Sequence, residues 1–182
     1  MTCIVGLVEN GTVYMGGDSA GVAGFDLTVR ADEKVFRNGD YLMGFTSSFR
    51  MGQLLRYAFE PPEIKDGEEI NKFMATRFVD AVRQCLKDGG YARKKDEEEI
   101  GGTFLVGYKG WLFKIQDDYQ VAVSFFRFDV VGCGESYAKG ALFAMNQEYP
   151  PEQQVRLALE AAEQFSAGVR RPFTILSLRG CD

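Results

Sequence analysis

The sequence predicts an α+β fold: a four-layer αββα sandwich of two mainly antiparallel sheets between helix pairs. Two patterns along the chain lead to this prediction. Short apolar, β-branched segments come in pairs joined by two-residue turns, which is typical of β-hairpins. Segments with an apolar residue at every third or fourth position lie between them, as in amphipathic helices. Because each helix has one apolar face, it needs a sheet beneath it, and two stacked sheets leave one outer face for each helix pair.

Three turns that end in glycine define six of the predicted strands. The pairs are 3–8 with 12–15 across Asn10-Gly11, 34–37 with 41–45 across Asn38-Gly39, and 104–108 with 111–115 across Lys109-Gly110. Asn-Gly is the strongest short hairpin signal. Residues 121–131 predict one further long strand, and 173–178 predict the last strand of the chain.

Four helices are predicted between these strands, over 51–59, 70–86, 136–147 and from 150 onward. Ser47 and Ser48 are candidate N-caps of the first helix, because a hydroxyl there can accept from the free N–H groups of the first turn. Gly89-Gly90 is expected to end the second helix. The charged run at 93–99 is mixed in sign and predicts a solvated loop.

Composition is consistent with one globular domain over residues 1–182. The chain is 46% apolar and 26% charged, which argues against disorder. A domain of this length buries enough surface to fold without a metal or a disulfide. The formal net charge of −5 argues against non-specific nucleic-acid binding. The absence of histidine excludes every His-based catalytic triad and every His-ligated metal site.

The four cysteines Cys3, Cys85, Cys133 and Cys181 form no C-x-x-C pair, which argues against a zinc or redox motif. With no secretory signal at the N-terminus, they are interpreted as reduced thiols in a cytoplasmic protein. No apolar run is long enough to span a membrane, so no membrane association is expected.

The start of the chain, Met1-Thr2, suggests a chemistry that needs no histidine. Methionine aminopeptidase removes Met before small residues, so the mature chain would begin at Thr2. An N-terminal threonine carries its nucleophile, the hydroxyl, and its base, the free α-amino group, on one residue. The pKa of an α-amino group, ~7.7–8.0, suits a base at neutral pH.

Several motifs downstream fit this chemistry jointly. They are Thr2-Cys3-Ile4-Val5-Gly6, Gly17-Asp18-Ser19, Glu33-Lys34-Val35, Gly44-Phe45-Thr46-Ser47, Gly102-Thr103 through Gly107-Tyr108, and Gly132-Cys133-Gly134 with Tyr137-Ala138. In these residues, over essentially the whole chain, the sequence resembles the proteasome β-subunits and, more closely, the bacterial HslV-type peptidase subunits. Both are N-terminal-nucleophile hydrolases.

The resemblance implies a role for each residue of the candidate site. Thr2 would be the nucleophile, and Lys34 a buried cation that favours the alkoxide and keeps the α-amino group neutral. Asp18 would pair with Lys34 so that the ammonium is not left uncompensated. A backbone N–H in the turn at 46–48, that of Ser47, would stabilise the oxyanion. Cys133 would lie near the N-terminal amine.

Three positions depart from the family pattern. Cys133 stands where the family usually has serine, and a thiol is a weaker donor and acceptor than a hydroxyl. Ser47 stands where the family usually has glycine, so the backbone conformation of that turn is in question. The family often has an Asp-x-x-Ser pair on the last helix, for which Glu163 and Ser166 are the nearest match.

The resemblance also implies partners. A threonine peptidase subunit of this family acts on peptides or unfolded proteins from within a homo-oligomeric double ring, which an ATP-dependent unfoldase can feed. The mechanism needs no cofactor. Two alternatives stay open: a catalytically silent structural ring subunit, and a small-molecule amidase of the same superfamily. Candidate residues of the substrate pocket are Gly21, Val22, Ala31, Thr46 and Arg50.

Overall fold

The computed structural model describes residues 1–95, 98–145 and 149–180 of the chain. Its strands form two main sheets whose neighbouring strands are all antiparallel. The four-stranded sheet has the order β12-β1-β2-β13. Its strands are β12 (Phe128–Gly132), β1 (Cys3–Glu9), β2 (Thr12–Gly17) and β13 (Thr174–Arg179). The predicted antiparallel sheets are therefore confirmed.

The second sheet has five strands in the order β11-β10-β9-β6-β5. They are β11 (Val121–Ala122), β10 (Trp111–Ile115), β9 (Phe104–Tyr108), β6 (Tyr41–Phe45) and β5 (Val35–Asn38). The Asn10-Gly11 and Lys109-Gly110 turns have positive φ angles at both residues, as expected of tight hairpin turns.

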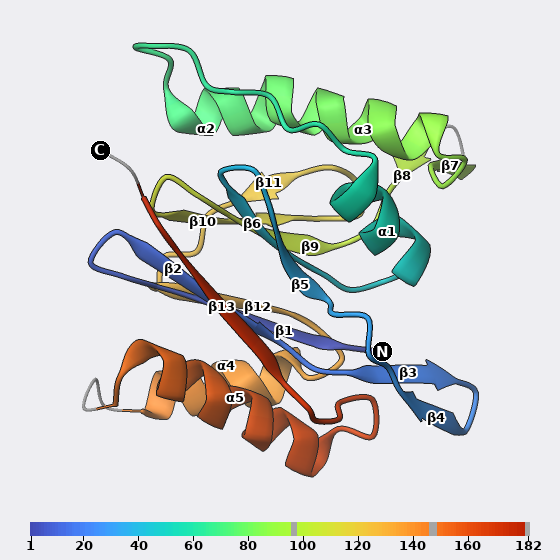
Figure 1. Cartoon of the computed structure of the whole chain (residues 1–182), viewed down its shortest axis with the longest axis vertical. Coiled ribbons are helices and arrows are strands. Elements are labelled where there is room, and N and C mark those ends of the chain that lie inside the picture. The colour runs from blue at the N-terminus through green and yellow to red at the C-terminus, as the bar shows by residue number, and fades with distance from the viewer. Residues whose placement is uncertain (96–97, 146–148, 181–182) are drawn as a thin grey trace.

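The helices lie on the outer faces of the two sheets (Figure 1). On one side are α1 (Phe49–Tyr57) and a longer helix in which α2 (Ile70–Phe73) continues through a π-helical turn (Met74–Phe78) into α3 (Val79–Asp88). On the other side are α4 (Glu135–Ala144) and α5 (Pro151–Phe165). No helix in the described part of the chain is long and apolar enough to cross a bilayer.

Three apolar clusters fill the spaces between these elements. One lies between the five-stranded sheet and α1 to α3, and contains Phe45, Phe78 and Phe104. A second joins the four-stranded sheet to α4 and α5 through Val5, Leu159 and their neighbours. The third, which includes Ile4, Met15 and Leu42, lies between the two sheets. The helices therefore bury the apolar faces that their periodicity predicts.

The structure corrects the sequence prediction in three places. The apolar segment 121–131 is two strands, β11 and β12, which belong to different sheets. Residues 20–29, for which no strand is predicted, form the hairpin of β3 (Ala20–Ala23) and β4 (Asp26–Val29). The charged run expected to be a loop contributes the strand β7 (Arg93–Lys95), which pairs with β8 (Glu98–Ile100).

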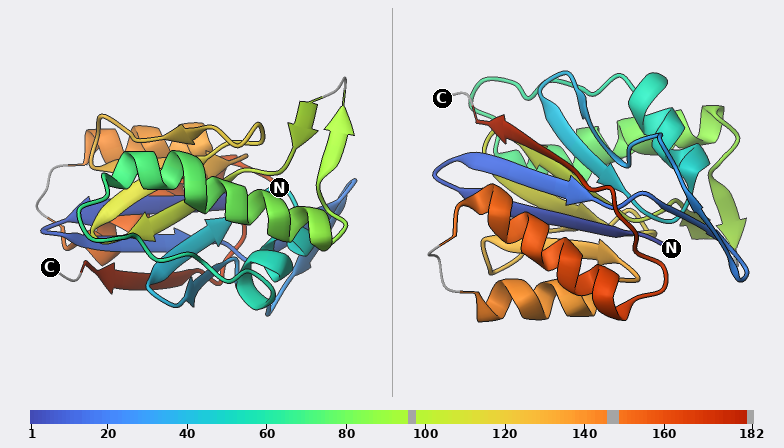
Figure 2. Two further views of the ribbon diagram at one scale, coloured as in Figure 1. Left: turned by 90° about the horizontal axis from the view of Figure 1, so that it is seen from above. Right: turned by 60° about the horizontal axis from the view of Figure 1, so that its bottom comes forward.

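The start of the chain and the β3–β4 hairpin lie at the same end of the molecule (Figures 1 and 2). The β1–β2 turn and the C-terminal end of β13 lie at the opposite end. Because β1 is an inner strand of its sheet, between β12 and β2, its first residues are held from both sides. This placement holds the N-terminal residues beside the last residues of β2 and β12.

Candidate active site

The residues around Thr2 make the core of the candidate site. Thr2 is buried and lies directly before β1. Its backbone N–H donates to Sγ of Cys133 at 3.3 Å, and the Cys133 thiol donates to its carbonyl oxygen at 3.4 Å. Its hydroxyl donates to the carbonyl oxygen of Met1 at 2.5 Å. Because Met1 is attached, the Thr2 nitrogen is a peptide amide, and only removal of Met1 would make it a base.

Asp18 follows β2 and organises the neighbouring backbone with its carboxylate. Oδ1 accepts from the Cys3 N–H at 2.9 Å and from Nζ of Lys34 at 2.9 Å. Oδ2 accepts from the N–H of Ala20 at 2.8 Å and from that of Arg170 at 3.2 Å. Four donors thus meet one carboxylate, and two of them connect the lysine directly to the residue after Thr2.

The Asp18–Lys34 ion pair is fully buried, with both side chains 0% exposed. Nζ of Lys34 also donates to the carbonyl oxygen of Ala20 at 2.7 Å and lies 5.6 Å from the centroid of the Phe49 ring. Burial lowers the pKa of Lys34 from its ordinary value, while the charge of Asp18 opposes that shift. An ammonium held in this way provides a positive charge beside the chain start without solvent around it.

Two glycines allow the close packing at this point. A Cβ on Gly17, the last residue of β2, would lie 2.9 Å from side-chain atoms of Ile4 and of Val35. Gly132, at the end of β12, has φ of +104°, and a Cβ there would lie 2.1 Å from the carbonyl oxygen of Thr2. Gly132 is therefore required for the close approach of β12 to Thr2.

The turn after β6 lies next to the same point. An atom at the Cβ position of Gly132 would lie 3.4 Å from Oγ1 of Thr46. Ser47 adopts φ of +65°, the left-handed conformation that favours glycine, so the glycine-type backbone of this turn persists despite the side chain. Its hydroxyl accepts from the N–H of Thr103 at 3.1 Å. Among the described residues, the N–H of Ser47 has no hydrogen-bond partner.

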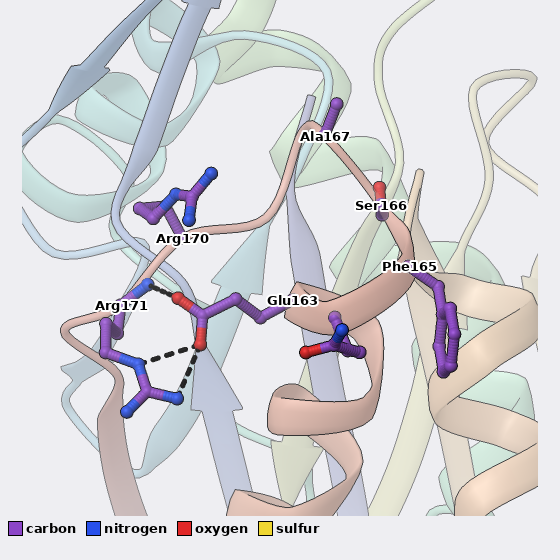
Figure 3. A pocket seen from close by; sticks show the side chains of 7 residues that line it. Glu163, Phe165, Ser166, Ala167, Arg170 and Arg171 are labelled. Carbon is purple, nitrogen blue, oxygen red and sulfur yellow. Dashed lines mark hydrogen bonds and ion pairs between the residues drawn. The ribbon is translucent and has the colours of Figure 1, made fainter.

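The last helix contributes one of its two candidate residues. The Ser166 hydroxyl donates to Sγ of Cys133 at 3.4 Å, which extends the contacts of Thr2 to the end of α5. Glu163 does not join them. Its carboxylate accepts instead from the backbone N–H and the guanidinium of Arg171, each at 2.8 Å (Figure 3). This pairing lowers the pKa of Glu163.

Only some of the candidate substrate-pocket residues line a common hollow. Gly21 and Val22 line a hollow of about 290 Å³ together with Arg30 and Phe49. Ala31 is exposed and does not line it. Arg50 donates instead to the carbonyl oxygen of Gly89 at 3.3 Å.

Sequence reasoning missed the hydrogen bonds that Asp18 receives from Ala20 and Arg170. Both donors are backbone N–H groups, which any residue other than proline can supply. No residue type at those positions could have signalled them.

The charged groups at this site are those of Asp18 and Lys34. Among residues 1–95, 98–145 and 149–180, no three Cys, Asp or Glu side chains come together in a group that could hold a metal ion. The lysine and the carboxylate supply the local charges instead.

No protein-family model and no curated protein matches this chain. Solved structures do. BPH from Thiobacillus denitrificans superposes with a TM-score of 0.80 at 21% identity, over 99% of both chains. The same protein in complex with epoxomicin gives 0.80 at 20% identity, over the full length of both chains.

Two further structures resemble the chain. HslV from Trypanosoma brucei has a TM-score of 0.70 at 19% identity, over 98% of this chain and 99% of its own. Anbu, an ancestral β-subunit from Yersinia bercovieri, has 0.65 at 15% identity, over 98% and 82%. These neighbours confirm, at the level of the fold, the resemblance drawn from the sequence: the chain has the fold of the HslV-like, proteasome-type hydrolases.

Proposed function

We propose that the chain is a threonine-type endopeptidase subunit of a self-compartmentalising ring protease in the cytoplasm. Residues 1–182 would form a single domain of the four-layer αββα type found in N-terminal-nucleophile hydrolases. The observation that carries the proposal is the buried Asp18–Lys34 pair at the chain start, where one carboxylate oxygen accepts from both Lys34 and the N–H of Cys3.

In the proposed reaction, removal of Met1 frees the α-amino group of Thr2. That amine takes the hydroxyl proton as Oγ1 attacks the carbonyl carbon of the substrate peptide. The Lys34 ammonium favours the alkoxide and keeps the amine neutral. The N–H of Ser47 donates to the oxyanion, a contribution of about 3–4 kcal/mol for a preorganised donor.

The second half of the reaction regenerates the enzyme. As the C–N bond breaks, the leaving amine takes the proton held by the α-amino group, and the acyl group stays on Oγ1 as an ester. Water then attacks the ester and passes its proton to the α-amino group of Thr2. The α-amino group returns this proton to Oγ1 as the carboxylic acid leaves, which restores the hydroxyl, so no cofactor is consumed.

The substrates would be peptides or unfolded proteins, and the subunits would assemble into a double ring. The fold of HslV and of the BPH structures supports this, and BPH was solved with epoxomicin. An ATP-dependent unfoldase would deliver the substrates. No observation on this chain favours a small-molecule amidase or a silent subunit over the peptidase.

The test combines three measurements. Intact-mass analysis of the protein from its own cells should give Thr2 as the first residue. A fluorogenic peptide amide should be hydrolysed by the wild-type protein and, more slowly, by Thr2→Ser, but not by Thr2→Ala. Epoxomicin should add its mass to the wild type but not to Thr2→Ala. Retention of Met1, or turnover that is unchanged in Thr2→Ala, would overturn the proposal.

A further inference from the structure

The β3–β4 hairpin projects from the surface of this chain, and it is joined to the rest of the fold through the buried Ala20 at its base and through Arg30, which lies over the Phe49 ring. Its two strands pair with each other, and all four residues of β4 are exposed. Figures 1 and 2 show it extending away from the two main sheets. Strand pairing alone gives a two-stranded hairpin only marginal stability in water, so packing against another surface would further stabilise the part of the hairpin beyond its buried base.

Three exposed side chains of the hairpin are large and apolar. Phe25, next to the glycine of its turn, is fully exposed at 108% of its reference area. Leu27 and Val29 of β4 are also exposed. Apolar side chains that gather on a protruding element mark a surface that another protein covers.

A hollow of matching character lies at the other end of the molecule. It measures about 390 Å³ and is lined by Val8, Gly110, Trp111, Leu112, Val123, Ser124, Phe125, Phe126 and Arg127. Phe125 is 98% exposed, and Trp111, Val123 and Phe126 are also exposed. Phe126 contacts the ring of Phe125 and that of Phe143, with centroids 5.7 and 5.9 Å apart, which makes a continuous aromatic rim.

The positions of the two surfaces prevent them from meeting within one chain. Gly110, at the edge of the hollow, packs against Gly11 of the β1–β2 turn. Figure 1 shows this turn at the end of the molecule opposite to the hairpin. Different surfaces at opposite ends make a head-to-tail contact, which closes into a ring when the rotation between copies allows it.

Charge supports the same pairing. Asp26 stands beside Phe25 and is exposed, and Lys109 stands beside Gly110 and is exposed. Neither side chain has an ion-pair or hydrogen-bond partner among the described residues. A carboxylate on the hairpin and an ammonium at the hollow would come together when Phe25 enters it.

We propose that the β3–β4 hairpin of one copy of this chain docks into the aromatic hollow of the next copy, with Phe25 as the central buried side chain. The proposal names the surfaces that assembly would use, and it stands on these surfaces whether or not Thr2 is catalytic. An aromatic anchor in an apolar pocket is the usual form of a dominant contact in an interface.

The first test measures assembly of the full chain by light scattering over a dilution series. Phe25→Asp should raise the dissociation constant about 30-fold or more, the effect of losing a dominant contact. Tyr57→Asp is the matched control, since Tyr57 is an exposed aromatic residue on α1 that belongs neither to the hairpin nor to the lining of the hollow. A wild-type protein that stays monomeric, or an equal loss in Tyr57→Asp, would overturn the proposal.

Two further variants identify the contact itself. Asp26→Lys and Lys109→Asp should each weaken assembly several-fold, and the double variant should recover it. In a background in which Cys85, Cys133 and Cys181 are replaced by serine, a chain carrying both Phe25→Cys and Phe125→Cys should form a covalent ladder of copies under mild oxidation. In the same background, covalent dimers from Phe25→Cys alone would mean that hairpins meet each other, which would overturn the proposal. Circular dichroism confirms that each variant is folded, and peptide hydrolysis separately tests the proposed function.

Discussion

Replacing Asp18 with asparagine tests the buried ion pair most directly. The carboxylate accepts two hydrogen bonds on each oxygen, so the amide group of the substituted side chain would turn one acceptor into a donor that faces two other donors. The Lys34 ammonium would also lose its counter-charge while it stays buried. Breaking a buried pair on one side costs about 3–5 kcal/mol.

Urea unfolding measures this cost. With a slope of about 2 kcal/mol/M, a loss of about 3–5 kcal/mol moves the midpoint down by about 1.5–2.5 M. Lys34→Met in the Asp18→Asn background removes the uncompensated charge and should recover part of the loss. Peptide hydrolysis should remain absent in the double variant, because both charges beside Thr2 are gone.

The pH dependence of the stability of Asp18→Asn tests the same ion pair independently. Without Asp18, the pKa of Lys34 loses the largest influence that opposes its lowering by burial. Between this lowered pKa and the ordinary lysine value of about 10.4, the unfolded chain binds more protons than the folded one, so stability rises with pH. The destabilisation should therefore be largest near neutral pH and shrink toward pH 10. An Asp18→Asn midpoint equal to that of the wild type would refute the reasoning.

Three other substitutions have defined outcomes. Gly132→Ala should lower stability by about 2 kcal/mol or more and abolish peptide hydrolysis, because φ is +104° and the new Cβ would lie 2.1 Å from the Thr2 carbonyl oxygen; thermal unfolding and activity measure this. Cys133→Ser should fold normally and raise kcat/KM a few-fold, since a hydroxyl hydrogen-bonds the Thr2 backbone better than a thiol; unchanged or lower kcat/KM would contradict this. Glu163→Gln should reduce stability at pH 7, by an amount that shrinks as the pH falls: the pKa of Glu163 is lowered by Arg171, so its contribution is present above the ordinary glutamate pKa and is lost as pH falls through the lowered value. Unfolding midpoints of the variant and the wild type over an acidic pH series check it.

Sequence patterns predicted the secondary structure where turn residues or helical periodicity mark an element locally. The hairpin turns and the stripe over 70–86 specify their own geometry locally, so they could be recognised without the rest of the chain. The segment 121–131 could not be divided in this way. Its strands are apolar on both sides of the break, and only the stacking of two sheets decides that β11 and β12 belong to different ones.

The sequence pattern singled out Thr2, Asp18 and Lys34 as specific residue types at recognisable spacing. The structure joins Asp18 to Lys34 and to the N–H of Cys3, the residue after Thr2, and the catalytic roles of these residues stay a prediction. The rest depends on backbone groups from distant segments, such as the Arg170 N–H that meets Asp18 across a separation of 152 residues. Such contacts follow from the path of the chain, which no local pattern encodes.

The hairpin and the site are linked through Ala20, which belongs to both. Its N–H donates to Asp18, its carbonyl accepts from Lys34, and it is the first residue of β3, paired with Val29 of β4. A neighbouring copy that holds Phe25 would restrain this strand, and through its first residue the buried ion pair. An isolated subunit would keep the Asp18–Lys34 pair but would hold it against a hairpin that is free on its outer side. Assembly would thus order the same residues that the proposed chemistry uses, because the strand that reaches outward begins inside the site.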